Sequence, residues 1–79
     1  MSAFRRIKPD RDAKQKFSSL QALGGDVVVS AVASKGDDLN KDILREGDEV
    51  RGPFELVEVE SGSFSDPGVV LAYYAQSEG

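Results

Sequence analysis

Hydrophobic positions recur in the first third of the chain at the spacing of a helix. Ala13, Phe17 and Leu20 are separated by four and then three residues. Intervals of three and four place side chains on one face of an α-helix. The glycine pair Gly24-Gly25 is suited to ending such a helix in a left-handed conformation. The pattern therefore predicts a helix over residues 10–23.

Three later segments have patterns typical of strands. Residues 26–34 are rich in β-branched residues and are apolar or small on both faces, which favours an interior strand. Residues 54–60 alternate, but their apolar positions change parity between Leu56 and Val57, which predicts a β-bulge there. Residues 69–74 form the last predicted strand, joined to the previous one as a long-looped hairpin.

Two shorter segments complete the predicted elements. Ile43 and Leu44 fit the apolar side of a short helix over residues 40–46. Pro9 lacks a backbone donor and favours an extended residue before it, so residues 1–9 form either a basic arm or an edge strand.

Together these elements predict a small α+β fold. The N-terminal helix and the short second helix cover one face of a three-stranded sheet, mixed or antiparallel, with a fourth strand if the N-terminal residues pair. A small β-barrel is the alternative, because residues 44–50 resemble a turn and strand common in such barrels. A length of 79 residues allows one domain, residues 1–79.

Charge is distributed unevenly along this domain. Residues 1–17 carry six bases against two acids, a net of +4, and residues 18–79 carry four bases against 12 acids, a net of −8. An acidic body favours a basic partner surface and repels a polyanion.

The composition argues against an enzyme. The chain has no His and no Cys, so it lacks the usual proton shuttle near neutral pH and a thiol nucleophile. It contains no Gly-x-Ser-x-Gly elbow and no glycine-rich phosphate loop. We therefore expect no catalytic residue and no cofactor.

One acidic segment has part of the spacing of a calcium-binding loop. Asp38, Asn40 and Asp42 occupy positions 1, 3 and 5 of that loop, and Glu49 occupies position 12. Position 6 is Ile43, where the sharp turn requires glycine. Capping of the short helix explains these side chains better, so we predict no metal site.

Three aromatic residues are candidates for binding a partner protein. Phe64 lies among Ser and Gly residues in the predicted 61–68 loop. Tyr73 and Tyr74 are adjacent on a strand and point to opposite faces, so we expect one of them to be buried. The chain is thus predicted to be a non-enzymatic protein–protein interaction or regulatory module that binds through its sheet face or edge and this loop. A second copy is one candidate partner, because so short a chain has a thin core.

The alternative function is nucleic-acid binding by the basic N-terminal segment. Its candidate phosphate contacts are Arg5, Arg6, Lys8 and Arg11. No apolar segment has the length of a membrane span or the pattern of a secretory signal, so we expect no membrane partner and a cytoplasmic location.

Overall fold

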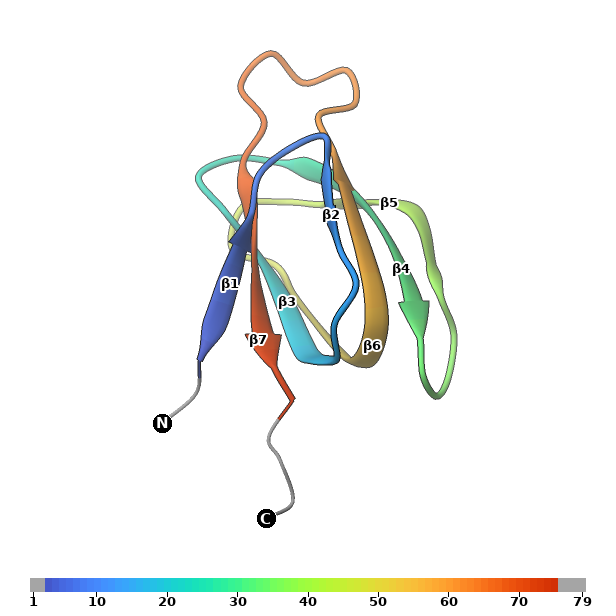
Figure 1. Ribbon diagram of the computed structural model, residues 1–79. Coiled ribbons are helices and arrows are strands. Elements are labelled where there is room, and N and C mark those ends of the chain that lie inside the picture. Colours follow the sequence, from blue (N-terminus) through green and yellow to red (C-terminus); the bar gives the residue numbers. More distant parts are fainter. Residues whose placement is uncertain (1–2, 76–79) are drawn as a thin grey trace.

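The protein is an all-β domain. The computed structural model describes residues 3–75, which form seven antiparallel strands of one sheet (Figure 1). The strands are β1 (Phe4–Ile7), β2 (Arg11–Ala13), β3 (Phe17–Leu23), β4 (Val27–Ala33), β5 (Leu39–Leu44), β6 (Glu49–Glu60) and β7 (Val69–Tyr74).

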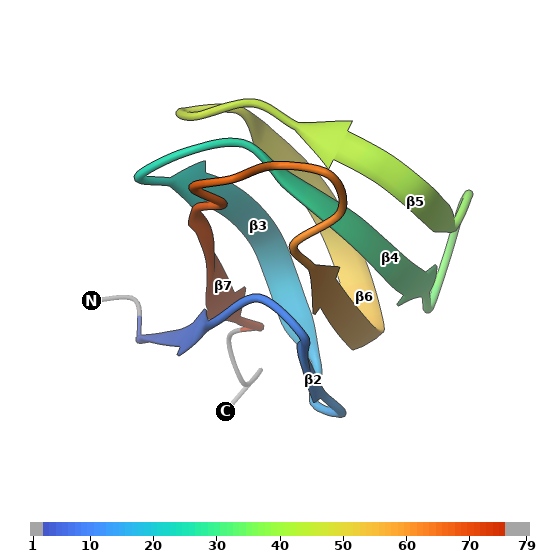
Figure 2. The same ribbon diagram turned by 90° about the horizontal axis from the view of Figure 1, so that it is seen from above.

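The sheet is strongly curled. Its strand order is β1-β7-β3-β6-β4-β5, and β2 pairs with β6. Ala13 lies opposite Val57 and Phe17 lies opposite Phe54, so β2 and β3 follow one another along the same long strand. Seen from above, β4 and β5 lie on one side of the curl and β1 and β2 on the other (Figure 2).

The inside of the curl holds the hydrophobic core. Phe17 and Phe54 are its largest fully buried side chains. The Phe17 ring contacts the Tyr74 ring, with 5.4 Å between the ring centroids. The other core residues are Ile7, Ala13, Leu20, Ala22, Val27, Val29, Ala31, Leu44, Val57, Val59, Val70 and Ala72.

The predicted α+β fold is wrong, and the N-terminal helix is the first reason. Residues 10–23 form β2, a bend and β3 instead. Ala13 and Phe17 lie on either side of the bend, and the register of β3 shifts between Phe17 and Ser19. That shift puts both Phe17 and Leu20 inside, so a strand irregularity produced the helical spacing.

The predicted short helix is also absent from the described chain, because residues 39–44 form edge strand β5. The carboxylates expected to cap a helix bind other backbone amides. Asp38 Oδ1 accepts a hydrogen bond from Ala33 N at 2.8 Å, and Asp42 Oδ2 accepts one from Asn40 N at 3.1 Å. Helix caps and the turns between strands use the same side-chain acceptors, so the sequence does not distinguish a helix cap from a turn.

The three predicted strands are present with a different topology. Residues 26–34 contain β4, residues 54–60 are the second half of β6, and residues 69–74 are β7. All pairings are antiparallel, and β3 lies between β6 and β7, so the last two strands are not a hairpin.

A bulge in β6 lies close to the predicted place. Ala33 is opposite Phe54 and Val32 is opposite Leu56, which leaves Glu55 as the extra residue. The shift lets both Phe54 and Val57 face the core.

The small β-barrel alternative also differs from the observed sheet. Strands β1 and β5 end the strand order, and no pairing between them closes the sheet among residues 3–75. Both edge strands therefore remain available for contact with solvent or a partner.

Candidate functional site

The outer face of β1, β7, β3 and β6 carries an aromatic pair. Phe4 lies opposite Tyr73, Tyr73 opposite Ser19, and Ser19 opposite Arg51, which makes one row across four strands. The Phe4 and Tyr73 ring centroids are 5.8 Å apart, and the rings are tilted by 53°. The Tyr73 hydroxyl donates a hydrogen bond to Gln21 Oε1 at 3.4 Å. This bond holds the Tyr73 ring against the sheet.

The next rows extend the same surface. Arg6 lies opposite Leu71, Leu71 opposite Gln21, and Gln21 opposite Glu49. Leu23, which is 44% exposed, lies opposite Val69. We call this surface the aromatic face; its members are Phe4, Arg6, Ser19, Gln21, Leu23, Glu49, Arg51, Val69, Leu71 and Tyr73.

A second outer surface lies over β2, β6, β4 and β5. Asp12 is opposite Glu58, and Glu58 is opposite Ser30. Glu60 is opposite Val28, and Val28 is opposite Ile43. We call this surface the acidic face; its members are Asp12, Val28, Ser30, Ile43, Glu58 and Glu60.

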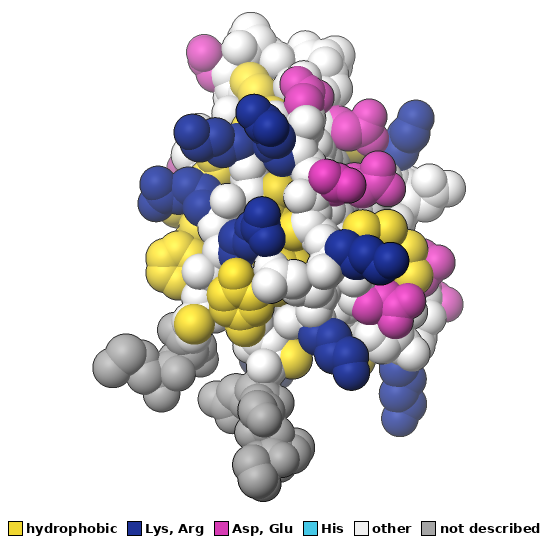
Figure 3. Space-filling model, in the orientation of Figure 1, with side chains coloured by type: hydrophobic (Ala, Val, Ile, Leu, Met, Phe, Trp, Pro, Cys, Tyr) yellow, Lys and Arg dark blue, Asp and Glu magenta, His cyan; other side chains and the backbone are white. Residues whose placement is uncertain are grey.

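The two faces differ in charge. Figure 3 shows Lys and Arg side chains mixed with hydrophobic ones over β1 and β7 on the left, and Asp and Glu side chains at the upper right, over β2 and β6, with further Lys and Arg side chains beside and below them.

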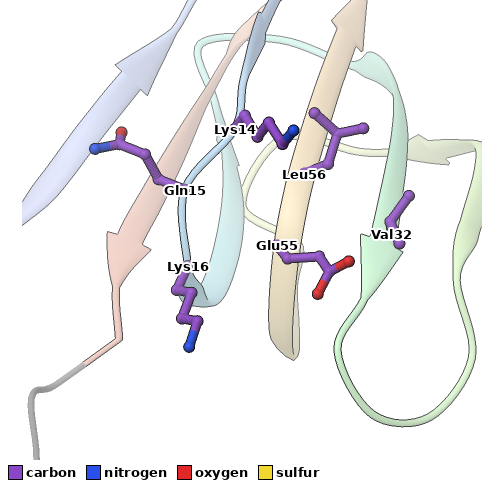
Figure 4. Close-up of a pocket in the computed structure, with 6 residues that line it drawn as sticks. All are labelled: Lys14, Gln15, Lys16, Val32, Glu55 and Leu56. Carbon is purple, nitrogen blue, oxygen red and sulfur yellow. The ribbon is translucent and has the colours of Figure 1, made fainter.

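A shallow depression of about 410 Å³ lies below the acidic face (Figure 4). It forms where the bend between β2 and β3 leaves β6. Val32 and Leu56 supply its apolar wall, Glu55 adds a carboxylate, and the bend contributes Lys14, Gln15 and Lys16.

The structure separates the three predicted partner-binding residues. Tyr74 contacts the core through Phe17, whereas Tyr73 is on the aromatic face. Phe64 is half-buried in the 61–68 loop, on the side of β4. A Cβ on Gly62 would lie 2.7 Å from Val28 Cγ2 and 3.9 Å from Phe64 Cδ2, so the loop rests beside the acidic face.

The four predicted phosphate contacts are all exposed, but they do not share one face. Arg6 is on the aromatic face. Arg5 precedes it on β1 and therefore lies on the other side of the strand, where Arg5 Nη1 donates a hydrogen bond to Gln15 Oε1 at 2.9 Å. Lys8 lies in the turn after β1, and Arg11 begins β2 opposite Val59.

No metal-binding cluster is found in the described part of the chain. Residues 3–75 contain no group of three or more Asp, Glu, His or Cys side chains placed to hold a metal ion. The carboxylates of the calcium-like segment instead bind backbone amides near β5.

The sequence analysis missed most of the aromatic face. The alternation of Val69, Leu71 and Tyr73 is a signal for an outward-facing row on β7. Phe4 and Arg51 join that row only through pairing between strands distant in sequence, and no local pattern indicates it.

Comparisons with known proteins give no match: no family model fits the sequence, and no curated protein and no solved structure is significantly similar to it. Residues 3–75 contain no helix of the length and apolar character needed to cross a membrane. The functional argument therefore depends on the surfaces of this fold.

Proposed function

We propose that this protein is a non-enzymatic interaction module that binds another protein through the aromatic face. The observation that carries this proposal is the composition of that face. Phe4 and Tyr73 are in contact on its β1 side, Leu71 lies beside them with 9% exposure, and Arg6, Arg51 and Glu49 belong to the same rows. Protein interfaces combine an apolar and aromatic centre, often with Arg, and a polar rim in the same way.

The exposure of these residues supports a binding role. Phe4 is 49% exposed and Leu23 is 44% exposed, although both are large hydrophobic residues. Single exposed apolar residues are ordinary, but Phe4 and Leu23 share one uncovered sheet face, which favours contact with a partner.

The sequence supports a binding role over catalysis. With no His and no Cys, acid–base and nucleophilic chemistry would have to come from carboxylates, Lys, Ser or Tyr. The lack of cysteine also agrees with a reducing compartment, so we place the protein in the cytoplasm as part of this proposal.

The test is affinity capture with matched surface variants. Wild-type protein, Tyr73→Ala and Val32→Ala are immobilised, and proteins retained from a lysate of the source organism are quantified by mass spectrometry. Val32 is 37% exposed and lies outside the aromatic face, so Val32→Ala is the control. We expect Tyr73→Ala to reduce recovery of specific partners by about tenfold or more, as for loss of an aromatic anchor. Equal recovery by all three proteins would contradict the proposal.

Nucleic-acid binding is the second candidate, because the same face combines a pair of aromatic rings with Arg6 and Arg51. Single-stranded nucleic acids bind such platforms by base stacking and phosphate contacts. Fluorescence anisotropy with a labelled single-stranded oligonucleotide tests this candidate, which requires affinity that falls steeply with salt. An oligonucleotide that stays unbound at low salt would remove it.

A further inference from the structure

We infer that the partner of the aromatic face is a second copy of this chain, which presents its acidic face. This inference rests on the proposed function and names the partner. Each copy would use its aromatic face toward one neighbour and its acidic face toward another.

Charge complementarity is the first argument. The aromatic face carries Arg6 and Arg51 against Glu49. The acidic face carries Asp12, Glu58 and Glu60, and Lys14 lies in the depression below it. Asp12 and Glu58 are directly opposite on neighbouring strands, an arrangement that destabilises an isolated sheet. Arg side chains from a neighbour would relieve this repulsion.

Exposed apolar residues are the second argument. Phe4, at 49% exposure, and Ile43, at 55%, are the most exposed large hydrophobic residues of the described chain. Phe4 is on the aromatic face, and Ile43 is on the acidic face beside Val28. Each face therefore has an uncovered apolar contact for the other.

The edge of β5 is less suited to the contact than its face. The register of β4 and β5 shifts between Val29 and Ala31, and Lys41 has a positive φ of 50° in the same region. Irregularities of this kind in an edge strand prevent addition of another strand. The side chains of the acidic face remain free for docking.

The two complementary surfaces make the contact heterologous. Pairing of two acidic faces would bring like charges together, which costs several kcal/mol across an interface. When the aromatic face of one copy binds the acidic face of another, the first copy keeps a free acidic face and the second a free aromatic face. Further copies can bind there, so the copies form a closed ring or an open chain.

Sedimentation velocity of two face variants tests this inference. Phe4→Glu puts a carboxylate on the aromatic face, and Glu58→Lys reverses a charge on the acidic face. We expect wild-type protein to associate reversibly and more weakly at high salt. Each variant alone should associate at least about tenfold more weakly than wild type, because every possible contact then includes one altered face.

Mixing the two variants gives the decisive measurement. The unaltered acidic face of Phe4→Glu and the unaltered aromatic face of Glu58→Lys can still pair, so the mixture should regain association that neither variant shows alone. Glu46→Lys makes the same charge change in the turn before β6 and should associate like wild type. Thermal unfolding monitors that each variant is folded.

Two results would overturn the inference: wild-type protein that stays monomeric at all concentrations, or Glu58→Lys that associates like wild type. If the wild-type protein is monomeric but Tyr73→Ala still reduces the recovery of captured proteins, the proposed function stands and the partner is a different protein. Self-association that Phe4→Glu and Tyr73→Ala do not affect would also contradict the inference, and the capture experiment would still decide the proposed function.

Discussion

Adjacent tyrosines at the end of β7 have different roles. Tyr74 contacts Phe17 at the edge of the core, whereas Tyr73 contacts Phe4 on the outer face. Alternation along a strand causes this difference. The sequence analysis predicted that one of the two would be buried; both are half-buried, and Tyr74 is the one that packs against the core. The sequence did not indicate which one, since that depends on the register with β3.

The two tyrosines should therefore respond differently to truncation. We expect Tyr74→Ala to lower the free energy of unfolding by about 2 to 3 kcal/mol, since it removes a large side chain packed against the core. Tyr73→Ala should lower it by less, about 1 kcal/mol, since this half-buried side chain contacts Phe4 and Gln21 on the outer face and not the core. Urea unfolding followed by circular dichroism measures both values. Equal losses would place both rings in the core or both on the surface.

At the scale of the elements, irregular strands explain why the fold class was mispredicted. The interval from Phe17 to Leu20 looks helical, but it follows from a register shift against β6 and β7, whose residues lie more than 30 positions later. A local pattern contains no information about such partners. Regular segments such as β4 and β7 could be predicted because burial and β-branched residues there agree.

The pairing of β2 with β6 contains an unfavourable contact that a substitution can remove. Asp12→Lys would place an ammonium group opposite Glu58 in place of a carboxylate. We expect it to stabilise the domain by about 0.2 to 1 kcal/mol, the range for cross-strand charge pairs. Thermal unfolding at low salt measures the change. Asp37→Lys, an exposed site in the turn before β5, is the matched control and should have little effect. A similar gain from both substitutions would attribute the effect to net charge alone.

At the scale of the whole molecule, the two ends of the chain meet in one pair of strands. Phe4 to Ile7 pair with Val70 to Tyr73, so β1 is part of the sheet although its sequence also fits a basic arm. The aromatic face depends on the pairing of β1 with β7, because β1 supplies Phe4 and Arg6. Sequence alone gave the charge asymmetry but not the two surfaces on which the charges gather.

Ile7 links β1 to the core, so its truncation tests the pairing of β1 with β7. Ile7 is 3% exposed, whereas Phe4 on the same strand is 49% exposed. We expect Ile7→Ala to lower the free energy of unfolding by about 2 to 4 kcal/mol and Phe4→Ala by less than about 1 kcal/mol. Denaturant titrations of both variants check the difference. A small effect of Ile7→Ala would mean that β1 detaches readily from β7.

The turn between β4 and β5 projects away from both faces. A Cβ on Gly36 would meet no atom within 4 Å, and Lys35 beside it is exposed. Because the chain has no cysteine, Lys35→Cys would create a single thiol for attaching a fluorophore. Energy transfer between labelled copies could then report assembly without a dye touching either docking surface.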